Sequence, residues 1–399
     1  MRRIDDPIAR RIQAMTGREK FLKENQWYYY LMASDALHGS KVTVNGREML
    51  MFASYSYLDL IGHPRINAAA KAAIDEFSTG THGVRLLAGT TRLHLELEET
   101  IARFKKTDAA VTYSSGFVTN MAAIAALTGR HDFVFSDRLN HASIVDGCLL
   151  SMAKFERFKH NDMDDLERKL SSVDPAAGKL VITDAVFSMD GDIINLPAMY
   201  DLCRKYGAWL MVDEAHSLGV LGKTGHGIEE HFGMEGCIDI KMGTLSKTIP
   251  SVGGYIAGDA ELIGYLKHAS RPFIFSAALP PAAVAAAKEA FHVIEDEPER
   301  VHKAQHNMRY FIDRLQAAGF NTLNTETCIV PIICGSEEKA WEMARLSQAE
   351  DIFVLPVVSP AVPEGLSRLR ANVTAAHSID EIDYAVDVFT RAAKKVGVL

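Results

Sequence analysis

Val212-Asp213-Glu214-Ala215-His216 carries the end of one predicted strand, and Gly243-Thr244-Leu245-Ser246-Lys247 carries the end of another. Between about residues 60 and 285, short apolar runs of this kind alternate with segments of helical periodicity. Strands that alternate with helices indicate a mostly parallel central sheet that helices wrap on both faces. Ligands of such sheets bind beyond the carboxyl ends of the strands, which is where Asp213 and Lys247 fall. The strands predicted here span residues 132–137, 179–184, 208–213 and 238–244.

The flanking segments complete an α/β organisation in three units. A charged helical arm is followed by Asn45-Gly46, a pair that favours a two-residue hairpin turn with positive φ. An Ala-rich helix over 282–294 is expected to begin at its proline, and strands are expected near 327–333 and 367–373. The predicted units are an N-terminal arm and hairpin (1–59), a large domain (60–285) and a small α+β C-terminal domain (286–399).

Composition excludes several classes of protein. With 399 residues, 48% hydrophobic and 24% charged, the chain has the size and balance of a two-domain globular protein. A net charge of -8 argues against a nucleic-acid-binding surface, which needs clustered Lys and Arg. The five cysteines form no CxxC pair, so neither a disulfide framework nor a metal site is expected. The expected location is a reducing cytoplasm. The charged amino terminus, Met1-Arg2-Arg3-Ile4-Asp5-Asp6, precedes no apolar stretch, and no signal peptide or membrane span is predicted.

Polar residues follow several of the predicted strands and are the first candidates for a functional site. Ser115 and Gly116 stand where a strand runs into a helix, and a helix amino terminus offers free N–H groups to a phosphate. His141 follows the strand at 132–137, where an imidazole can stack on an aromatic ligand. Ser188 follows the next predicted strand. Each residue alone is equally compatible with a polar turn, so the prediction depends on the set.

A lysine and an aspartate at the ends of two strands are what an enzyme dependent on pyridoxal 5′-phosphate (PLP) requires. The amine of Lys247 would bond to the cofactor aldehyde, and the carboxylate of Asp213 would keep the pyridine nitrogen protonated, so that the ring accepts electrons. His216, in the turn after Asp213, and Ser188 would bond the phenolic oxygen of the same ring. PLP is therefore the predicted cofactor.

Taken together, the motifs resemble those of the α-oxoamine synthases, a PLP-dependent family of fold type I. The resemblance runs from about residue 45 to the carboxy terminus. It implies a mostly parallel central sheet with a smaller C-terminal domain. Its landmarks are Asn140-His141-Ala142-Ser143, Val212-Asp213-Glu214-Ala215-His216-Ser217, Gly243-Thr244-Leu245-Ser246-Lys247, Arg271-Pro272-Phe273-Ile274-Phe275-Ser276, and Leu369-Arg370 followed by Thr374-Ala375-Ala376-His377.

The resemblance implies a role for each matching residue. Lys247 would be the Schiff-base lysine and the acid–base group, Asp213 the partner of the pyridinium, and His141 the ring that stacks on the cofactor. Tyr55 and Arg370 would lie in the substrate site, with Arg370 binding the amino-acid carboxylate through a bidentate contact. The other residues implied around the ring or phosphate are Ser115, Gly116, Phe117, Ser188, His216 and Thr244.

The resemblance also implies a homodimer with shared active sites, because Ser276 would reach the phosphate of the partner subunit's cofactor. The implied reaction is the decarboxylative condensation of serine, alanine or glycine with an acyl thioester of coenzyme A or a carrier protein, giving an α-aminoketone. The alternatives are a transaminase or lyase on the same sheet, and a non-catalytic relative, against which the presence of Lys247, Asp213 and His141 together argues.

The branch within the family is predicted from fewer residues. Ser54-Tyr55-Ser56-Tyr57-Leu58 resembles most closely the segment found in bacterial serine palmitoyltransferases, and 8-amino-7-oxononanoate synthase or 2-amino-3-ketobutyrate coenzyme A ligase activity is the alternative. Four residues depart from the pattern of that branch: Ser56, Val84, Pro250 and Val358. Val84 is expected to reshape the amino-acid pocket, and Val358 replaces an arginine expected near the carboxylate or thioester.

Overall fold

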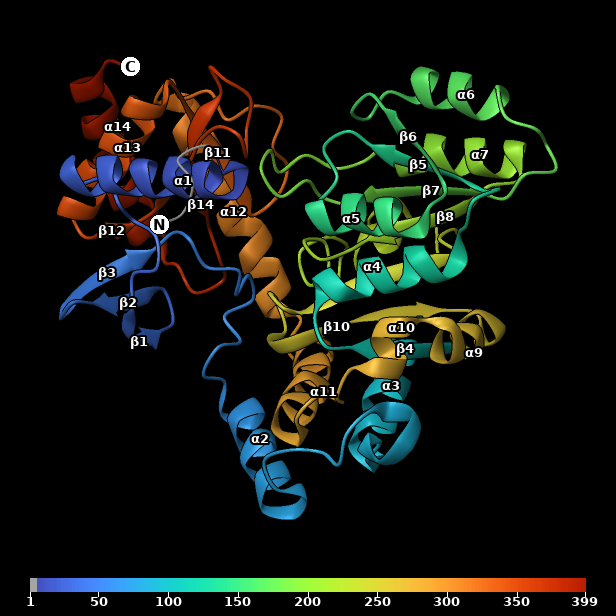
Figure 1. Cartoon of the computed structure of the whole chain (residues 1–399). Coiled ribbons are helices and arrows are strands. Elements are labelled where there is room, and N and C mark those ends of the chain that lie inside the picture. The colour runs from blue at the N-terminus through green and yellow to red at the C-terminus, as the bar shows by residue number, and fades with distance from the viewer. Residues whose placement is uncertain (1–5) are drawn as a thin grey trace.

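A seven-stranded sheet forms the centre of the larger of two bodies in the computed structural model, which describes residues 6–399 (Figure 1). Its strand order is β4-β10-β9-β8-β7-β5-β6. The strands from β9 to β6 are parallel, and β10 runs antiparallel to both of its neighbours. The predicted mostly parallel sheet wrapped by helices is confirmed. The charged start of the chain, residues 1–5, lies outside the described residues.

The predicted strands of this sheet agree with the structure to within two residues at either end. β7 coincides with its prediction, and all of its residues are buried. This continuous burial is typical of a parallel strand covered on both faces, and it explains why apolar runs identified these strands. The strands of the sheet are β4 (Ala109–Tyr113), β5 (Phe133–Asp137), β6 (Lys154–Phe158), β7 (Lys179–Asp184), β8 (Trp209–Asp213), β9 (Ile240–Ser246) and β10 (Pro250–Gly258).

Two smaller sheets belong to the second body. The order β11-β14-β13 forms one, and β1-β2-β3-β12 forms the other. Asn45 and Gly46 have φ of 51° and 74°, so the predicted positive-φ turn joins β2 to β3. The strands are β1 (Ser34–His38), β2 (Lys41–Val44), β3 (Arg47–Met51), β11 (Ile329–Gly335), β12 (Ile352–Phe353), β13 (Leu355–Val357) and β14 (Ser367–Asn372).

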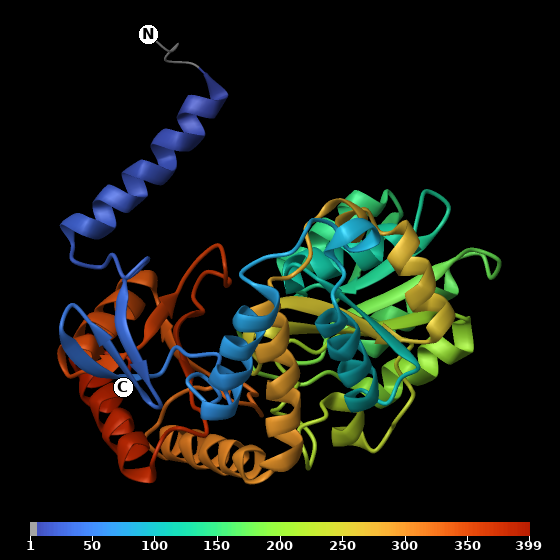
Figure 2. The ribbon, with the colours of Figure 1, turned by 90° about the horizontal axis from the view of Figure 1, so that it is seen from below.

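The N-terminal hairpin is joined to the C-terminal part of the chain. β3 pairs in parallel with β12, with Leu50 opposite Ile352. The first helix, α1, extends away from both bodies (Figure 2). The division of the chain at residues 59 and 285 stays a prediction, but backbone hydrogen bonds hold the first and third predicted units in one sheet.

Helices cover the large sheet and connect the two bodies. The predicted helix after residue 281 is confirmed as α11, whose first residue is Pro281, and α12 continues into the second body (Figure 1). No helix among residues 6–399 is long and apolar enough to cross a membrane. The helices are α1 (Pro7–Glu24), α2 (Pro64–Phe77), the π-helix η1 (Arg85–Gly89), α3 (Arg92–Phe104), α4 (Gly116–Leu127), α5 (Ala142–Ser151), α6 (Met163–Ser171), α7 (Leu196–Tyr206), α8 (Ile228–Phe232), α9 (Ala260–Ala269), α10 (Arg271–Phe275), α11 (Pro281–Asp296), α12 (Glu299–Ala317), α13 (Glu337–Ala349) and α14 (Ile379–Val396).

Candidate active site

A cavity of about 250 Å³ opens at the carboxyl edge of the large sheet, and we call it the cofactor cavity. It lies where β7, β8 and β9 end and where α4 and α5 begin. Residues from distant parts of the chain meet here because parallel strands all end at the same edge. The residues predicted to contact the cofactor that line this cavity are Ser115, Gly116, Phe117, His141, Ser188, Asp213, His216, Thr244 and Lys247.

Lys247 follows β9 and points into a chain of hydrogen bonds. Its Nζ lies 2.7 Å from Nε2 of His216, and Nδ1 of His216 lies 2.7 Å from the hydroxyl of Tyr57. Burial lowers the pKa of the Lys247 amine to about 8, although the carboxylates of Asp213 and Asp184 raise it. Burial also lowers the pKa of His216 well below its usual value. The neutral form of this amine is therefore more populated near neutral pH than that of an ordinary lysine.

Asp213 ends β8 with its carboxylate fixed by two donors. The backbone N–H of Ala215 donates to Oδ1 at 2.9 Å, and the side-chain amide of Asn120 on α4 donates to Oδ2 at 2.7 Å. The carboxylate is buried, yet within residues 6–399 it forms no ion pair with a Lys, Arg or His side chain. A buried carboxylate without a cation favours a cationic ligand, and the protonated nitrogen of a pyridine ring meets that need.

The start of α4 has the features of a phosphate site. Ser115 is its N-cap, and its hydroxyl accepts from the N–H of Val118 at 3.2 Å. A Cβ placed on Gly116 would lie 2.8 Å from Oγ1 of Thr244, so only glycine lets the helix end approach β9 this closely. The free N–H groups of this helix end face the cofactor cavity together with the hydroxyl of Thr244.

His141 is the N-cap of α5, and its ring is oriented by a local hydrogen bond. Nδ1 lies 2.8 Å from the hydroxyl of Ser143, and the ring of Phe117 approaches edge-on with centroids 6.1 Å apart. The backbone N–H of His141 donates to Oδ2 of Asp184 at 2.9 Å. Burial lowers the pKa of the imidazole. A neutral, fixed ring at the cavity wall suits the predicted stacking role.

Arg370 on β14 brings an unused donor to the site from the second body. Its Nε donates to the backbone oxygen of Ser188 at 2.5 Å, and its guanidinium lies 5.0 Å from the ring centroid of Tyr55. Its Nη2 is buried and has no hydrogen-bond partner within residues 6–399. An unpaired buried guanidinium nitrogen costs free energy until an anion arrives, so this residue fits the predicted carboxylate contact.

Ser276 does not line the cofactor cavity. It follows α10 and borders a separate small hollow with Arg85 and Phe273. Arg85 is buried there and forms an ion pair with Glu98 at 2.8 Å. The segment of Ser276 is joined to that of Arg85 by a bridge between Val84 and Ala277.

The four departures from the family pattern have plain structural positions. Ser56 is buried, and its hydroxyl accepts from the backbone N–H of Leu60 at 3.1 Å, which closes the turn before α2. Val84 forms the bridge to Ala277 and does not line the cofactor cavity. Pro250 begins β10, and Val358 is buried in the core of the second body.

Among the residues at the site that the sequence did not assign, three make polar contacts with predicted site residues: Tyr57, Asn120 and Asp184. Asp184 ends β7 as Asp213 ends β8, so the strand-end position that identified Asp213 applies to it as well. Tyr57 lies within the segment quoted around Tyr55, and Asn120 lies shortly after Gly116, but the hydrogen-bond partners of both residues lie far along the chain. Helical or strand periodicity does not show which polar residue faces such a partner.

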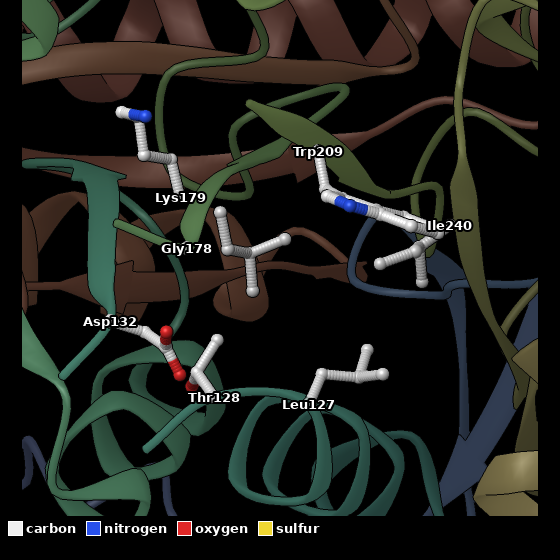
Figure 3. A pocket seen from close by; sticks show the side chains of 8 residues that line it. Leu127, Thr128, Asp132, Gly178, Lys179, Trp209 and Ile240 are labelled. Atoms are coloured by element: carbon white, nitrogen blue, oxygen red, sulfur yellow. The ribbon is translucent and has the colours of Figure 1, made fainter. Parts of the chain in front are cut away.

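The structure has a second cavity of about 250 Å³ at the opposite edge of the same sheet, which we call the amino-edge cavity. Figure 3 shows Trp209, Ile240 and Leu127 around it, with Asp132 and Lys179 at its border. None of the residues predicted for the site lines it. It therefore takes no part in the cofactor site.

The sheet, the amine of Lys247 and the carboxylate of Asp213 define a PLP-dependent transferase of fold type I. Residues 47–389 match the model of the family described as aminotransferase class I and II. The chain belongs to this family, and PLP is its cofactor. The residues present fit PLP: the start of α4 would receive the phosphate, Asp213 the ring nitrogen and Lys247 the aldehyde carbon.

Similar proteins narrow the class to the α-oxoamine synthases. 8-Amino-7-oxononanoate synthase of Thermoanaerobacter pseudethanolicus is 44% identical over 379 residues, which are 95% of this chain and 96% of that protein. Serine palmitoyltransferase of Sphingobacterium spiritivorum is 42% identical over 377 residues, 94% of each. The structure of S. paucimobilis serine palmitoyltransferase with bound PLP and myriocin has a TM-score of 0.95 at 31% identity and covers 99% of this chain and 100% of that chain.

Proposed function

We propose that this enzyme condenses a small amino acid with an acyl thioester, with loss of carbon dioxide, to give an α-aminoketone. The observation that carries the proposal is that the amine of Lys247 and the guanidinium of Arg370, whose buried Nη2 has no hydrogen-bond partner within residues 6–399, lie near the same tyrosine ring. Both groups lie against the ring of Tyr55, with Lys247 Nζ 5.8 Å from its centroid. PLP supplies the electron sink that stabilises negative charge on the α-carbon.

The residues of the chain then divide the remaining work. Arg370 binds the amino-acid carboxylate and thereby fixes which bond of the α-carbon faces Lys247. The neutral amine of Lys247 accepts the α-proton, and the hydrogen bond between this amine and His216 holds the amine in place. The hydroxyl of Tyr57 fixes the imidazole ring of His216 from its other side.

A neighbouring cavity of about 450 Å³ is the proposed site of the acyl group, and we call it the α2–α11 cavity. It shares Lys247 with the cofactor site, and Ile66, Ala70 and Ala286 from the two helices line it. Lys247 is the only charged side chain among its lining residues, all of which are described. An apolar wall beside the reacting amine suits a hydrocarbon chain.

The branch within the family depends on the far end of that acyl group. The name 8-amino-7-oxononanoate denotes a product with a terminal carboxylate, whereas a palmitoyl chain ends in an uncharged methyl group. The segment around Tyr55 favours the serine palmitoyltransferase branch, but the comparisons support the 8-amino-7-oxononanoate synthase alternative better, with 44% against 42% identity. The lack of a second cation in the α2–α11 cavity favours an uncharged chain.

A matrix of substrates tests the reaction and the branch together. Serine, alanine and glycine are each supplied with acyl thioesters of graded length, with and without a terminal carboxylate, and mass spectrometry scores the aminoketone and carbon dioxide. We expect an aminoketone product from at least one of the three small amino acids. Preference for the terminal carboxylate would identify the 8-amino-7-oxononanoate synthase type. Release of a free keto acid without acyl transfer would contradict the proposal and favour a transaminase.

The proposal includes a homodimer in which Ser276 completes the phosphate site of the partner subunit. Two observations support the homodimer. Ser276 lies outside the cofactor cavity of its own chain. The nearby side chains of Phe275 and Leu87 are large, apolar, and 73% and 83% exposed. Exposed apolar side chains that lie together mark an interaction surface. The five cysteines are free and buried, which suits a reducing cytoplasm.

Mixed dimers test the shared site. Ser276→Ala should weaken cofactor binding by about one charge-assisted hydrogen bond, roughly 1.5–3 kcal/mol. Mixing Lys247→Ala subunits with Ser276→Ala subunits places both lesions in one site and none in the other, so the second site should recover normal cofactor affinity. Mixed dimers that bind PLP no more tightly than the Ser276→Ala homodimer would show that Ser276 acts within its own chain.

A further inference from the structure

Three adjacent strands of the large sheet end in aspartates. β5 ends at Asp137, β7 at Asp184 and β8 at Asp213, and β7 lies between the other two strands. Asp184 and Asp213 are paired residues of parallel strands, so their side chains leave the same face of the sheet. Three carboxyl groups therefore gather at the edge where the cofactor cavity opens.

The two outer aspartates have partners that suit a negative charge. Asp137 lies 3.1 Å from Nδ1 of His160. Burial lowers the pKa of His160, but hydrogen bonds to Asp137 and Asp192 outweigh it and raise this pKa to about 10, so His160 is a cation at neutral pH. Asp213 accepts from two N–H donors and, in the proposed function, faces the protonated ring nitrogen.

Asp184 has no such counter-charge. Its Oδ2 accepts a hydrogen bond from the backbone N–H of His141 at 2.9 Å. Its Oδ1 has no hydrogen-bond partner within residues 6–399. The side chain is 6% exposed and lines the cofactor cavity. Burial, and then the charge of Asp213, raise the pKa of Asp184 well above its usual value, while Lys247 opposes the shift. The titratable groups around it come from β5, β8, the end of β9 and the start of α5: Asp137, Asp213, Lys247 and His141.

We propose that Asp184 is a positioning residue that works as a neutral carboxylic acid, whose Oδ2 fixes the backbone of His141 while its Oδ1 hydroxyl donates into the cofactor cavity beside Asp213. The inference rests on the proposed function only for the role of Asp213. With Asp184 neutral, Asp213 is the one negative charge opposite Lys247. A second carboxylate here would favour the ammonium form of Lys247, which cannot accept a proton.

Asparagine is the matched substitution, because it has the shape and hydrogen bonds of the neutral acid but cannot ionise. We expect Asp184→Asn to lose less than about tenfold in kcat/KM at neutral pH, and Asp184→Ala, which releases His141, to lose about a hundredfold. As the pH rises, wild-type activity should fall when Asp184 ionises, whereas Asp184→Asn should keep its activity to higher pH. Asp213→Asn should instead lose activity throughout, since that carboxylate must be charged.

Two measurements on the apoprotein test the same inference without turnover. Infrared spectroscopy of wild type near neutral pH should show a protonated carboxyl band that Asp184→Asn removes. Because folding raises the pKa of Asp184, its protonation stabilises the fold at low pH and this contribution is lost as the pH rises. The melting temperature of Asp184→Asn should therefore rise relative to wild type as the pH increases above the ordinary carboxyl pKa of about 4.

The outcomes separate this inference from the proposed function. An infrared band that survives Asp184→Asn, or a melting difference that does not change with pH, would show that Asp184 is ionised in the fold and overturn the proposal. An Asp184→Asn variant as inactive as Asp213→Asn would do the same. If the band disappears as expected but Asp213→Asn keeps full turnover, the neutral acid stands and the proposed function fails.

Discussion

The two edges of the seven-stranded sheet carry cavities of about the same volume, roughly 250 Å³ each, but of opposite chemistry. At the amino edge, the ammonium of Lys179 donates to two backbone oxygens, and Asp132 accepts from the N–H of Gly129, so local polar groups are paired. At the carboxyl edge, and among the described residues 6–399, Asp213 forms no ion pair and the nearby Arg370 has a buried donor without a partner. Volume does not distinguish the edges, whereas uncompensated buried polar groups do.

The largest expected effect at the carboxyl edge comes from Lys247→Ala. We expect turnover to fall by about four orders of magnitude or more, because one side chain both bonds the cofactor and accepts the α-proton. The wild-type protein should be yellow, and borohydride should remove the visible band and fix the cofactor to Lys247. Peptide mapping checks this assignment, and a reduced adduct on any other lysine would contradict it.

Asp213→Asn should give the next largest loss, about two to four orders of magnitude in kcat. A neutral amide has one acceptor oxygen, so it can keep the hydrogen bond from Ala215 or from Asn120 but not both, and it cannot hold the ring nitrogen protonated. Steady-state kinetics should therefore show a loss in kcat far greater than any rise in the KM for the amino acid. Turnover near the wild-type level would exclude the proposed role.

Arg370→Ala should act on binding more than on chemistry. Removal of a charge-assisted contact to the amino-acid carboxylate should raise the KM for the amino acid by about 10- to 100-fold, the equivalent of roughly 1.5–3 kcal/mol. Arg370→Lys is the control, since it keeps the charge but not the planar fork, and we expect an intermediate KM. A KM unchanged in both variants would place the carboxylate elsewhere.

The sequence predicted the residues at the carboxyl edge of the large sheet better than it predicted the full set of strands in that sheet. Apolar runs identified β7 and β8 because both are buried on two faces, and the strand ends led to Asp213. β10 was missed because it begins at Pro250 and contains Gly253-Gly254, residues that weaken a strand prediction. Its antiparallel position between β4 and β9 depends on partners far away in the chain.

Within the site, residues were predictable where a local motif fixes their role. Ser115 and Gly116 follow from a strand that runs into a helix, and the structure places them at the start of α4. Asn120 bonds Asp213 across 93 positions of the chain, and such a contact exists only once the sheet has formed. Long-range polar partners of this kind are set by topology, which local periodicity does not encode.

The smallest expected effect on turnover comes from a substitution at the amino edge of the sheet. This substitution is the control for those at the carboxyl edge. Trp209 lines the amino-edge cavity with Ile240 and is 52% exposed, so Trp209→Ala removes an apolar wall of this cavity without leaving a charge unpaired (Figure 3). We expect the free energy of unfolding to fall by about 1 kcal/mol, with cofactor affinity and kcat within about twofold of wild type. Denaturant unfolding and steady-state kinetics on the same preparation measure both. A tenfold loss of turnover with the fold intact would mean that this edge also takes part in function, and that cavity volume rather than unpaired polarity is the better guide.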